Sequence, residues 1–231
     1  MKLKNKIVLI TGASRGIGQA IAETFSNEGA TVIVNYLNSE DKAMEIIKKI
    51  RVKSLDSIAI KADVSNQKEI RNMFAQIQEE FGGLDVLVNN AGVLYRGKPE
   101  DLDESTWDRI FDVNVKGTFM CSMEAAKIMK ARDNPTIINI SSVAALIAVP
   151  SEIPYGASKA AMIRLSKSLA IQFANYNIRS NIILPGSIDT PMQYRWKKDP
   201  NAKKQLEKLI PLKRIGKPQD IANSIIFLLS D

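Results

Sequence analysis

The chain has 231 residues, of which 45% are apolar and 25% are charged, a balance typical of a globular protein with a substantial core. It contains no histidine and a single cysteine, Cys121. A histidine base, a Ser-His-Asp triad, a histidine-ligated metal and an intrachain disulfide are therefore excluded, and no other metal motif is present. Apolar runs are too short for a membrane helix or a signal peptide, so we expect a cytoplasmic protein without a membrane partner.

The net charge of +7 is concentrated in one segment. Residues 195–217 contain nine basic and two acidic residues, and the rest of the chain is neutral. The ordinary interpretation is a solvated helix face with no ligand. The alternative is attraction of an anionic substrate or partner. Nucleic acid is disfavoured because no binding motif accompanies the charge.

Short apolar runs rich in β-branched residues alternate with longer helical patterns along the chain. Strands that are apolar throughout are typical of a parallel sheet covered by helices on both faces. The expected strands are residues 7–10, 31–34, 57–60, 84–88, 136–140 and 179–184, and the expected helices are residues 17–28, 39–53, 66–81, 105–131 and 155–174.

The alternation predicts a single α/β domain over residues 1–231, with a Rossmann-type, doubly wound parallel sheet in three layers. No linker, low-complexity tract or internal repeat divides the chain. Residues 185–217 are the least regular stretch and contain several prolines. We expect a loop with one or two short helices there, at the strand ends where such sheets bind ligands.

The first expected strand runs directly into a glycine-rich turn at residues 11–18, Thr-Gly-Ala-Ser-Arg-Gly-Ile-Gly. Its spacing is G-x-x-x-G-x-G, which differs from the G-x-G-x-x-G of many dinucleotide folds. Glycines let the backbone approach a pyrophosphate closely, and the N-terminus of the next helix stabilises the negative charge. A glycine cluster can also be an ordinary tight turn, but this position between strand and helix favours a nucleotide site.

The end of the second expected strand bears on the choice of cofactor. A carboxylate there would hold the ribose 2′-hydroxyl of NAD and repel the 2′-phosphate of NADP, but the strand ends in Val34, Asn35 and Tyr36. Arg15 in the glycine turn could pair with a phosphate. The sequence therefore favours NADP(H) over NAD(H), with a solvated Arg15 and a permissive site as the alternative.

Three polar side chains are expected near the end of the fifth strand. Tyr155 and Lys159 are four residues apart and share one helix face, and Ser142 precedes the tyrosine by 13 residues. Carbonyl reduction needs a hydride at carbon and a proton at oxygen. A free tyrosine has a pKa of about 10, and a lysine ammonium nearby would lower it. A serine hydroxyl can stabilise charge on the substrate oxygen.

Together these motifs resemble the short-chain dehydrogenase/reductase family. The similarity is collinear over nearly the whole chain, and the order and spacing of the motifs make it specific, although each motif alone is weak. It rests on residues 11–18, residues 89–92 (Asn-Asn-Ala-Gly), Asn114, Ser142, residues 155–159 (Tyr-Gly-Ala-Ser-Lys) and residues 185–186 (Pro-Gly).

The resemblance implies a role for each matching position. Tyr155 would be the general acid/base, and Lys159 would lower its pKa and bind the nicotinamide ribose. Ser142 would orient the substrate oxygen, and Asn114 would hold a water on the proton path. Local capping of turns is an equally good interpretation for Asp63 and Asn90. The expected cofactor contacts are Gly12, Ser14, Arg15, Gly16, Ile17, Gly18, Asn35, Asp63, Val64, Asn90, Ala91, Gly92, Tyr155, Lys159, Pro185, Gly186, Ile188 and Thr190.

Within the family, the chain is most similar to 3-oxoacyl-carrier-protein reductases. The variable loop that covers substrate would span residues 187–215 and coincides with the basic segment, which suggests an acyl-carrier-protein or coenzyme A thioester. A sugar or polyol dehydrogenase is the alternative, with Ser151 and Glu152 meeting hydroxyls, although an exposed Glu152 is the preferred interpretation. A regulator that binds nucleotide without turnover is disfavoured by the complete set of catalytic residues.

The similarity also implies assembly. Family members usually continue past residue 230 into a final strand and tail that contribute to the sheet and to a subunit contact. Either this sequence lacks a natural tail or its assembly differs, so the final edge strand is expected to be missing. We expect a homotetramer or dimer, with the helices at residues 105–131 and 155–174 at the interface.

Overall fold

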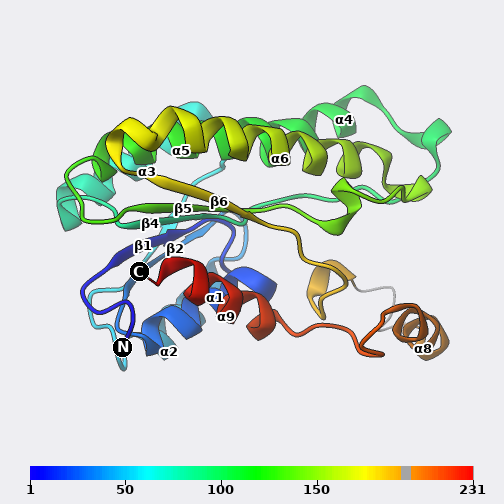
Figure 1. Cartoon of the computed structure of the whole chain (residues 1–231), viewed down its shortest axis with the longest axis horizontal. Coiled ribbons are helices and arrows are strands. Elements are labelled where there is room, and N and C mark those ends of the chain that lie inside the picture. The colour runs from blue at the N-terminus through cyan, green and yellow to red at the C-terminus, as the bar shows by residue number, and fades with distance from the viewer. Residues whose placement is uncertain (194–198, 231) are drawn as a thin grey trace.

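A computed structural model describes residues 1–193 and 199–230 and has a parallel six-stranded sheet at its centre (Figure 1). The strand order is β3-β2-β1-β4-β5-β6, so the chain winds outward in both directions from β1, as a doubly wound fold requires. The strands are β1 (Ile7–Ile10), β2 (Thr31–Tyr36), β3 (Ile58–Lys61), β4 (Val86–Asn89), β5 (Thr136–Ile140) and β6 (Arg179–Ile183).

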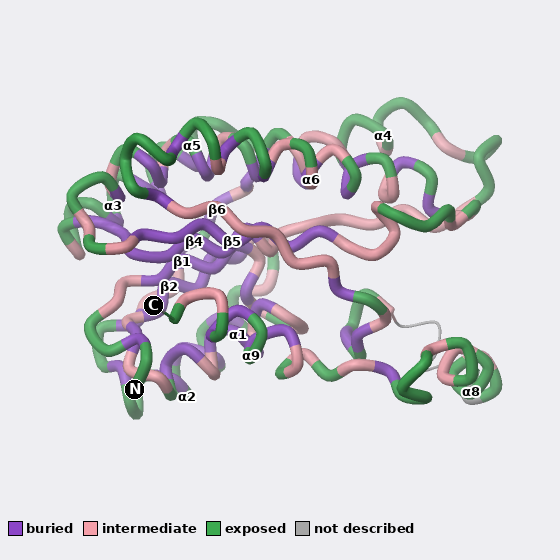
Figure 2. The backbone as a smooth tube through the Cα atoms, viewed as in Figure 1, coloured by how far each residue is buried: buried purple, intermediate pink, exposed green. Residues whose placement is uncertain are grey.

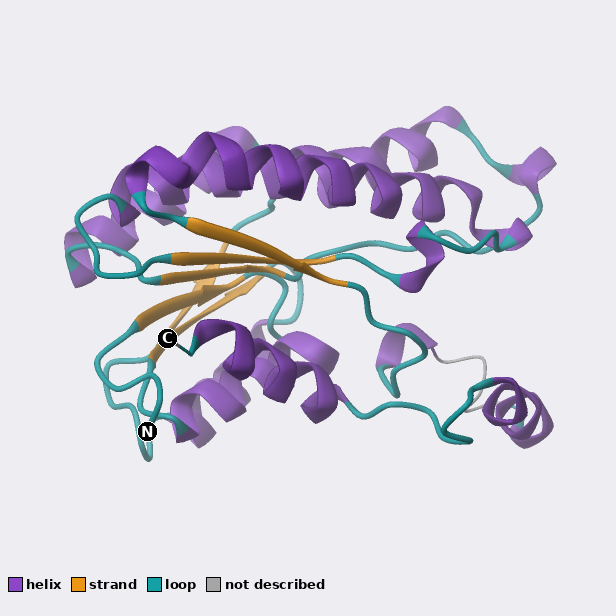
Figure 3. Ribbon diagram, in the orientation of Figure 1, coloured by secondary structure: helices purple, strands orange, loops and turns teal. Residues whose placement is uncertain are grey.

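Helices cover both faces of the sheet, which gives the three layers expected from the sequence (Figure 3). On one face lie α1 (Gly16–Asn27), α2 (Glu40–Ile50) and α9 (Pro218–Leu229), the last of which the sequence patterns did not predict. On the other face lie α3 (Gln67–Phe81), α4 (Glu104–Phe111), α5 (Thr118–Met129) and α6 (Ile153–Phe173), whereas α8 (Pro200–Leu209) stands apart from the sheet (Figure 1).

The alternation of side chains along each strand divides the apolar core into two. Val8 and Val32 face α1, α2 and α9, whereas Leu9 and Ile33 face α3 and α5. All four are fully buried, and the strands β1, β2, β4 and β5 are buried along nearly their whole length, whereas the edge strand β6 is half-buried (Figure 2). Helices cover both faces of these inner strands, which explains why they are largely apolar.

Several bounds differ from the sequence-based expectation. The second strand ends two residues later than expected, the third and fourth end one residue later and the sixth ends one residue earlier. In addition, the long helix expected at residues 105–131 is interrupted. Between α4 and α5 the chain forms a π-helical turn at Asp112–Gly117. Periodicity alone did not show this, because the π-helical turn is a single short segment between two helical patterns.

Cys121 packs inside the core, and burial raises the pKa of its thiol to about 12. Within the described ranges, no helix is long and apolar enough to cross a membrane. The same residues contain no cluster of three or more acidic or cysteine side chains that could hold a metal ion.

Candidate active site

The glycine turn between β1 and α1 has a backbone that other residues would not fit. Gly12 and Gly16 have φ angles of 61° and 62°, in the left-handed region that favours glycine. A Cβ atom at Gly12 would lie 2.8 Å from Cα of Ala91, and one at Gly18 would lie 2.6 Å from Nδ2 of Asn90. The turn therefore packs directly on the segment after β4, with its backbone free to approach a ligand.

Hydrogen bonds hold this turn against that segment. The Thr11 hydroxyl accepts from the backbone N–H groups of Asn90 and Ala91 at 3.0 Å each. The Asn90 amide donates to the carbonyls of Thr11 at 2.8 Å and Gly12 at 3.1 Å. The capping interpretation therefore holds for the Asn90 side chain.

Asn35 also acts as a brace. It is 1% exposed; its Oδ1 accepts from the Gly12 N–H at 3.1 Å, and its Nδ2 donates to the Ala62 carbonyl at 3.0 Å. Asn35 lines the cleft described below, and its contact with a cofactor stays a prediction. Its amide also joins the glycine turn to the ends of β2 and β3, because the strand order places three backbone segments around this one side chain.

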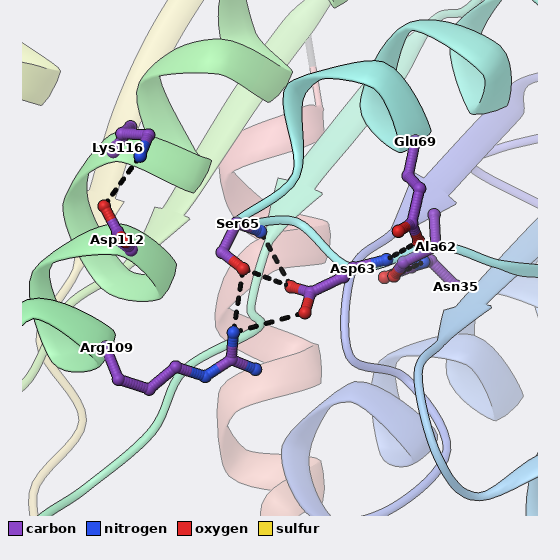
Figure 4. Close-up of polar contacts among 8 residues, drawn as sticks. All are labelled: Asn35, Ala62, Asp63, Ser65, Glu69, Arg109, Asp112 and Lys116. Atoms are coloured by element: carbon purple, nitrogen blue, oxygen red, sulfur yellow. Dashed lines mark hydrogen bonds and ion pairs between the residues drawn. The ribbon is translucent and has the colours of Figure 1, made fainter. Parts of the chain in front are cut away.

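Asp63 follows β3 and is held by a local network (Figure 4). Its Oδ1 accepts from the backbone N–H and hydroxyl of Ser65 at 2.8 and 2.7 Å, and its Oδ2 pairs with Arg109 at 3.2 Å. Burial raises the pKa of Asp63, but the hydrogen bonds from Ser65 and Arg109 outweigh it and lower the pKa below its usual value. Asp63 is thus a charged cap that also lines the cleft described below.

Tyr155 and Lys159 lie on the first turns of α6, beside the end of β5. Lys159 is 3% exposed, and its Nζ donates to the Ile140 carbonyl at 2.8 Å. The same nitrogen lies 5.7 Å from the centre of the Tyr155 ring. Ser142 caps a 3₁₀ turn at Val143–Ala145 and accepts from the Ala144 N–H at 3.1 Å. The structure therefore brings the three predicted side chains together.

The pKa values of this group differ from the sequence-based expectation. Desolvation lowers the pKa of Lys159 to about 7, so without a bound ligand its ammonium is largely lost above neutral pH. Burial raises the pKa of Tyr155, the interaction with Ser142 lowers it, and Glu152 raises it further. In the free protein the Tyr155 pKa is therefore raised, not lowered, chiefly because the phenolate would be desolvated.

Asn114 lies in the π-helical turn and is completely buried. Its Oδ1 accepts from the Val93 N–H at 2.9 Å, and its Nδ2 donates to the Ser158 hydroxyl at 3.0 Å. Its own carbonyl accepts from the Thr118 hydroxyl at 2.8 Å. The side chain therefore ties the turn to α6 and to the segment after β4.

A cleft of about 1060 Å³ runs along the carboxyl ends of the strands and joins the glycine turn to Tyr155. A volume of this size suits an extended ligand. Gly18 and Asn114 do not line it but support its wall from behind. The predicted residues that line it are Gly12, Ser14, Arg15, Gly16, Ile17, Asn35, Asp63, Val64, Asn90, Ala91, Gly92, Ser142, Tyr155, Lys159, Pro185, Gly186, Ile188 and Thr190.

Two arginines in this cleft, Arg96 and Arg109, were not predicted from the sequence, and the expected exposure of Glu152 was wrong. Glu152 was expected to be exposed, but it is only 7% exposed and forms an ion pair with Arg96. The spacing held a signal: Glu152 precedes Tyr155 by three residues, a separation that places side chains on one helix face. Nothing in the spacing pointed to Arg96, because its partner lies 56 residues away.

Comparison with known proteins gives consistent matches. The model of a family described as enoyl-(acyl carrier protein) reductase matches residues 12–231. The 3-oxoacyl-[acyl-carrier-protein] reductase of Staphylococcus epidermidis is 39% identical over 227 residues, which cover 98% of this chain and 92% of the relative. The Staphylococcus aureus protein of the same name is 40% identical over 226 residues, covering 98% and 91%.

Solved structures agree with the fold. A putative short-chain alcohol dehydrogenase from Sinorhizobium meliloti has a TM-score of 0.92 and 35% identity, with 99% of this chain and 90% of that chain covered. A double mutant of a Serratia marcescens short-chain dehydrogenase/reductase has a TM-score of 0.91 and 34% identity, covering 100% and 92%.

The doubly wound sheet, the glycine turn and the adjoining serine, tyrosine and lysine define an NAD(P)-dependent oxidoreductase. The chain belongs to the short-chain dehydrogenase/reductase family.

Proposed function

We propose that this protein is an NADP(H)-dependent reductase of 3-oxoacyl thioesters. The observation that carries the proposal is the single cleft in which Ser142, Tyr155 and Lys159 lie at one end and the glycine turn at the other. The names of the staphylococcal relatives support the same substrate class. Ser151 and Glu152 would support a sugar substrate if both were free to meet hydroxyls. Because Glu152 is paired with Arg96, the support for a sugar substrate is weaker.

The glycines at 12 and 18 let the turn pack directly on the segment after β4, and the N–H groups at the start of α1 suit the pyrophosphate of a dinucleotide. The nicotinamide would supply the hydride that adds to the carbonyl carbon. The Tyr155 hydroxyl then gives its proton to the carbonyl oxygen, and the Ser142 hydroxyl donates a hydrogen bond to that oxygen. Lys159 would hold the nicotinamide ribose and, as an ammonium, would stabilise the tyrosinate.

Asn114 has a different part in the proposal. Its side-chain amide is already bonded to Val93 and Ser158, so a water on the proton path would be bound by its main-chain carbonyl, which accepts from Thr118 and has a second lone pair. We propose that the side chain positions the π-helical turn beside Lys159. Gly92 makes this possible, since a Cβ there would lie 3.3 Å from Oδ1 of Asn114 and 3.5 Å from Nζ of Lys159.

Arg15 supports the preference for NADP(H) over NAD(H). It is exposed at the start of α1, lines the cleft and has no ion pair within the described ranges. The variant Arg15→Gln should raise the Kd of NADPH about tenfold more than that of NADH, because a charge-assisted bond to the 2′-phosphate is lost. Fluorescence titration measures both constants. Equal changes in the two constants would contradict the assignment, and comparable Kd values in the wild type would remove the preference.

The substrate class is tested by initial rates. NADPH oxidation with acetoacetyl-coenzyme A should be readily measurable, and NADP⁺ reduction with glucose should be slow or absent. Turnover of glucose but not of the thioester would replace the proposal with sugar oxidation. Binding of NADPH with no turnover of any carbonyl would favour a regulatory protein.

The loop over residues 187–215 is proposed to cover the substrate, as an insertion within a single domain. Lys203, Lys204 and Lys208 are exposed on α8, which suits an acidic carrier protein or coenzyme A as well as a solvated face. Arg195, Lys197 and Lys198, which contribute to the basic segment, lie outside the described residues.

Assembly into a homo-oligomer is proposed through the helices that carry exposed apolar side chains. Trp107, Phe119 and Met123 on α4 and α5 are 36–37% exposed, and Ile171 on α6 is 77% exposed. A dimer or tetramer would cover them.

A further inference from the structure

Three segments that are distant in sequence meet at the substrate end of the cleft through Arg96. Its Nη2 donates to Oε1 of Gln193 at 2.9 Å, and its Nε forms the ion pair with Glu152. Arg96 follows β4, Glu152 immediately precedes α6, and Gln193 ends a 3₁₀ turn at Pro191–Gln193 in the chain beyond β6. All three side chains line the same cleft as Tyr155.

The burial of this cluster indicates more than a surface ion pair. The side chain of Glu152 is 9% exposed and that of Arg96 is 21% exposed. Removing two charges from water costs several kcal/mol per ion unless they are paired and hydrogen-bonded, so the carboxylate fixes the orientation of the guanidinium. The two bonds use Nε and Nη2, which leaves the Nη1 donors of Arg96 without a partner among the described residues.

We propose that Arg96 is a specificity-determining residue that binds a second carbonyl oxygen of the substrate, two carbons from the carbonyl that is reduced. This inference rests on the proposed function, in which the thioester oxygen of a 3-oxoacyl group has that position. A guanidinium donates directionally to a carbonyl oxygen, and pairing with Glu152 neutralises its charge. The site therefore selects a neutral 1,3-dicarbonyl group over a ketone that lacks the second oxygen.

The cluster is also close enough to Tyr155 to act on its charge. Among the described residues, the charged groups that face Tyr155 are Lys159 on α6, Glu152 before it and Arg96. Glu152 raises the pKa of the tyrosine and Arg96 lowers it. Replacing either member should therefore move the pH profile of kcat/KM, and the two replacements should move it in opposite directions.

The test compares ethyl acetoacetate with hexan-2-one, a ketone of similar length that has no second carbonyl. The ratio of their kcat/KM values should fall about tenfold in Arg96→Gln, because the lost hydrogen bond affects only the dicarbonyl. Arg71→Gln is the matched control: this arginine is 61% exposed on α3 and pairs loosely with Glu124 at 3.7 Å, so the ratio should stay unchanged.

The pH profile of kcat/KM supplies a second readout. The limb of this profile that reports the ionisation of Tyr155 should move to lower pH in Glu152→Gln and to higher pH in Arg96→Gln. If Arg96→Gln does not fold, as judged by thermal unfolding, Arg96→Lys replaces it, since it keeps the charge and loses the planar fork. An unchanged ratio of the two kcat/KM values in Arg96→Gln, including an equal loss on both ketones, would overturn the inference.

Failure of the proposed function would give a different pattern of rates from failure of this inference. A wild-type enzyme that reduces ethyl acetoacetate but not acetoacetyl-coenzyme A would contradict the thioester assignment, and the Arg96 ratio would remain measurable. A wild-type enzyme that prefers hexan-2-one would overturn the inference itself.

Discussion

The variant Tyr155→Phe should lower kcat for carbonyl reduction about a thousandfold while the Kd of NADPH changes by no more than a few fold. Phenylalanine keeps the ring against Lys159 but has no proton to give, and general acid catalysis contributes roughly 10²–10⁴ to a rate. The raised pKa of Tyr155 keeps the hydroxyl protonated at neutral pH, which suits it to the reducing direction. Single-turnover NADPH oxidation and fluorescence titration measure the two quantities.

The control for this variant is Tyr176→Phe, which removes a hydroxyl from a tyrosine that is 41% exposed and packs against Lys130. It should behave as the wild type. If Tyr155→Phe kept more than a tenth of the wild-type kcat, another group would have to supply the proton. A parallel loss of NADPH binding would instead point to damage at the cofactor site.

The variant Gly12→Ala should raise the Kd of NADPH by about a hundredfold. Its φ of 61° costs an alanine about 1 kcal/mol, and its Cβ would lie 2.8 Å from Cα of Ala91. Because the obstacle is backbone, the turn itself must shift, and the N–H groups that would face a pyrophosphate shift with it. Calorimetric titration with NADPH measures the change.

The variant Gly82→Ala separates the effect of backbone strain from the effect of shifting the glycine turn. Gly82 ends α3 with a φ of 68°, and a Cβ there would meet no atom within 4 Å. Both alanine variants should therefore lose about 1 kcal/mol or more of the free energy of unfolding through the backbone, but only Gly12→Ala should lose affinity. Equal affinities in the two variants would show that the close approach to Ala91 does not position the turn.

The sequence also predicted much of the site, because the chemistry there depends on local spacing. Tyr155 and Lys159 share a helix face at a separation of four residues, and the glycines at 12, 16 and 18 have to follow a strand and precede a helix. These relations hold within one element and its flanking turn. They could therefore be inferred without knowing which strands are neighbours.

The roles of other residues depend on contacts between distant segments of the chain and could not be inferred from local spacing. Asn35 is predicted to contact the cofactor from its place at the end of β2, and only the strand order shows that its amide also bonds to Gly12 and Ala62. The sequence predicts an exposed Glu152, and only the structure shows its ion pair with Arg96. The raised pKa of Tyr155 follows from the burial of its hydroxyl in the folded protein.

The sequence by itself determined the strands, most of the helices, the glycine turn and which side chains are proposed to react, since these follow from apolar periodicity, spacing and residue type. Only the tertiary structure decided which polar groups are free for a ligand and which are used as braces. Hydrogen-bond partners and desolvation are properties of neighbours in space, and in a doubly wound sheet those neighbours come from β-strands that are far apart in the chain.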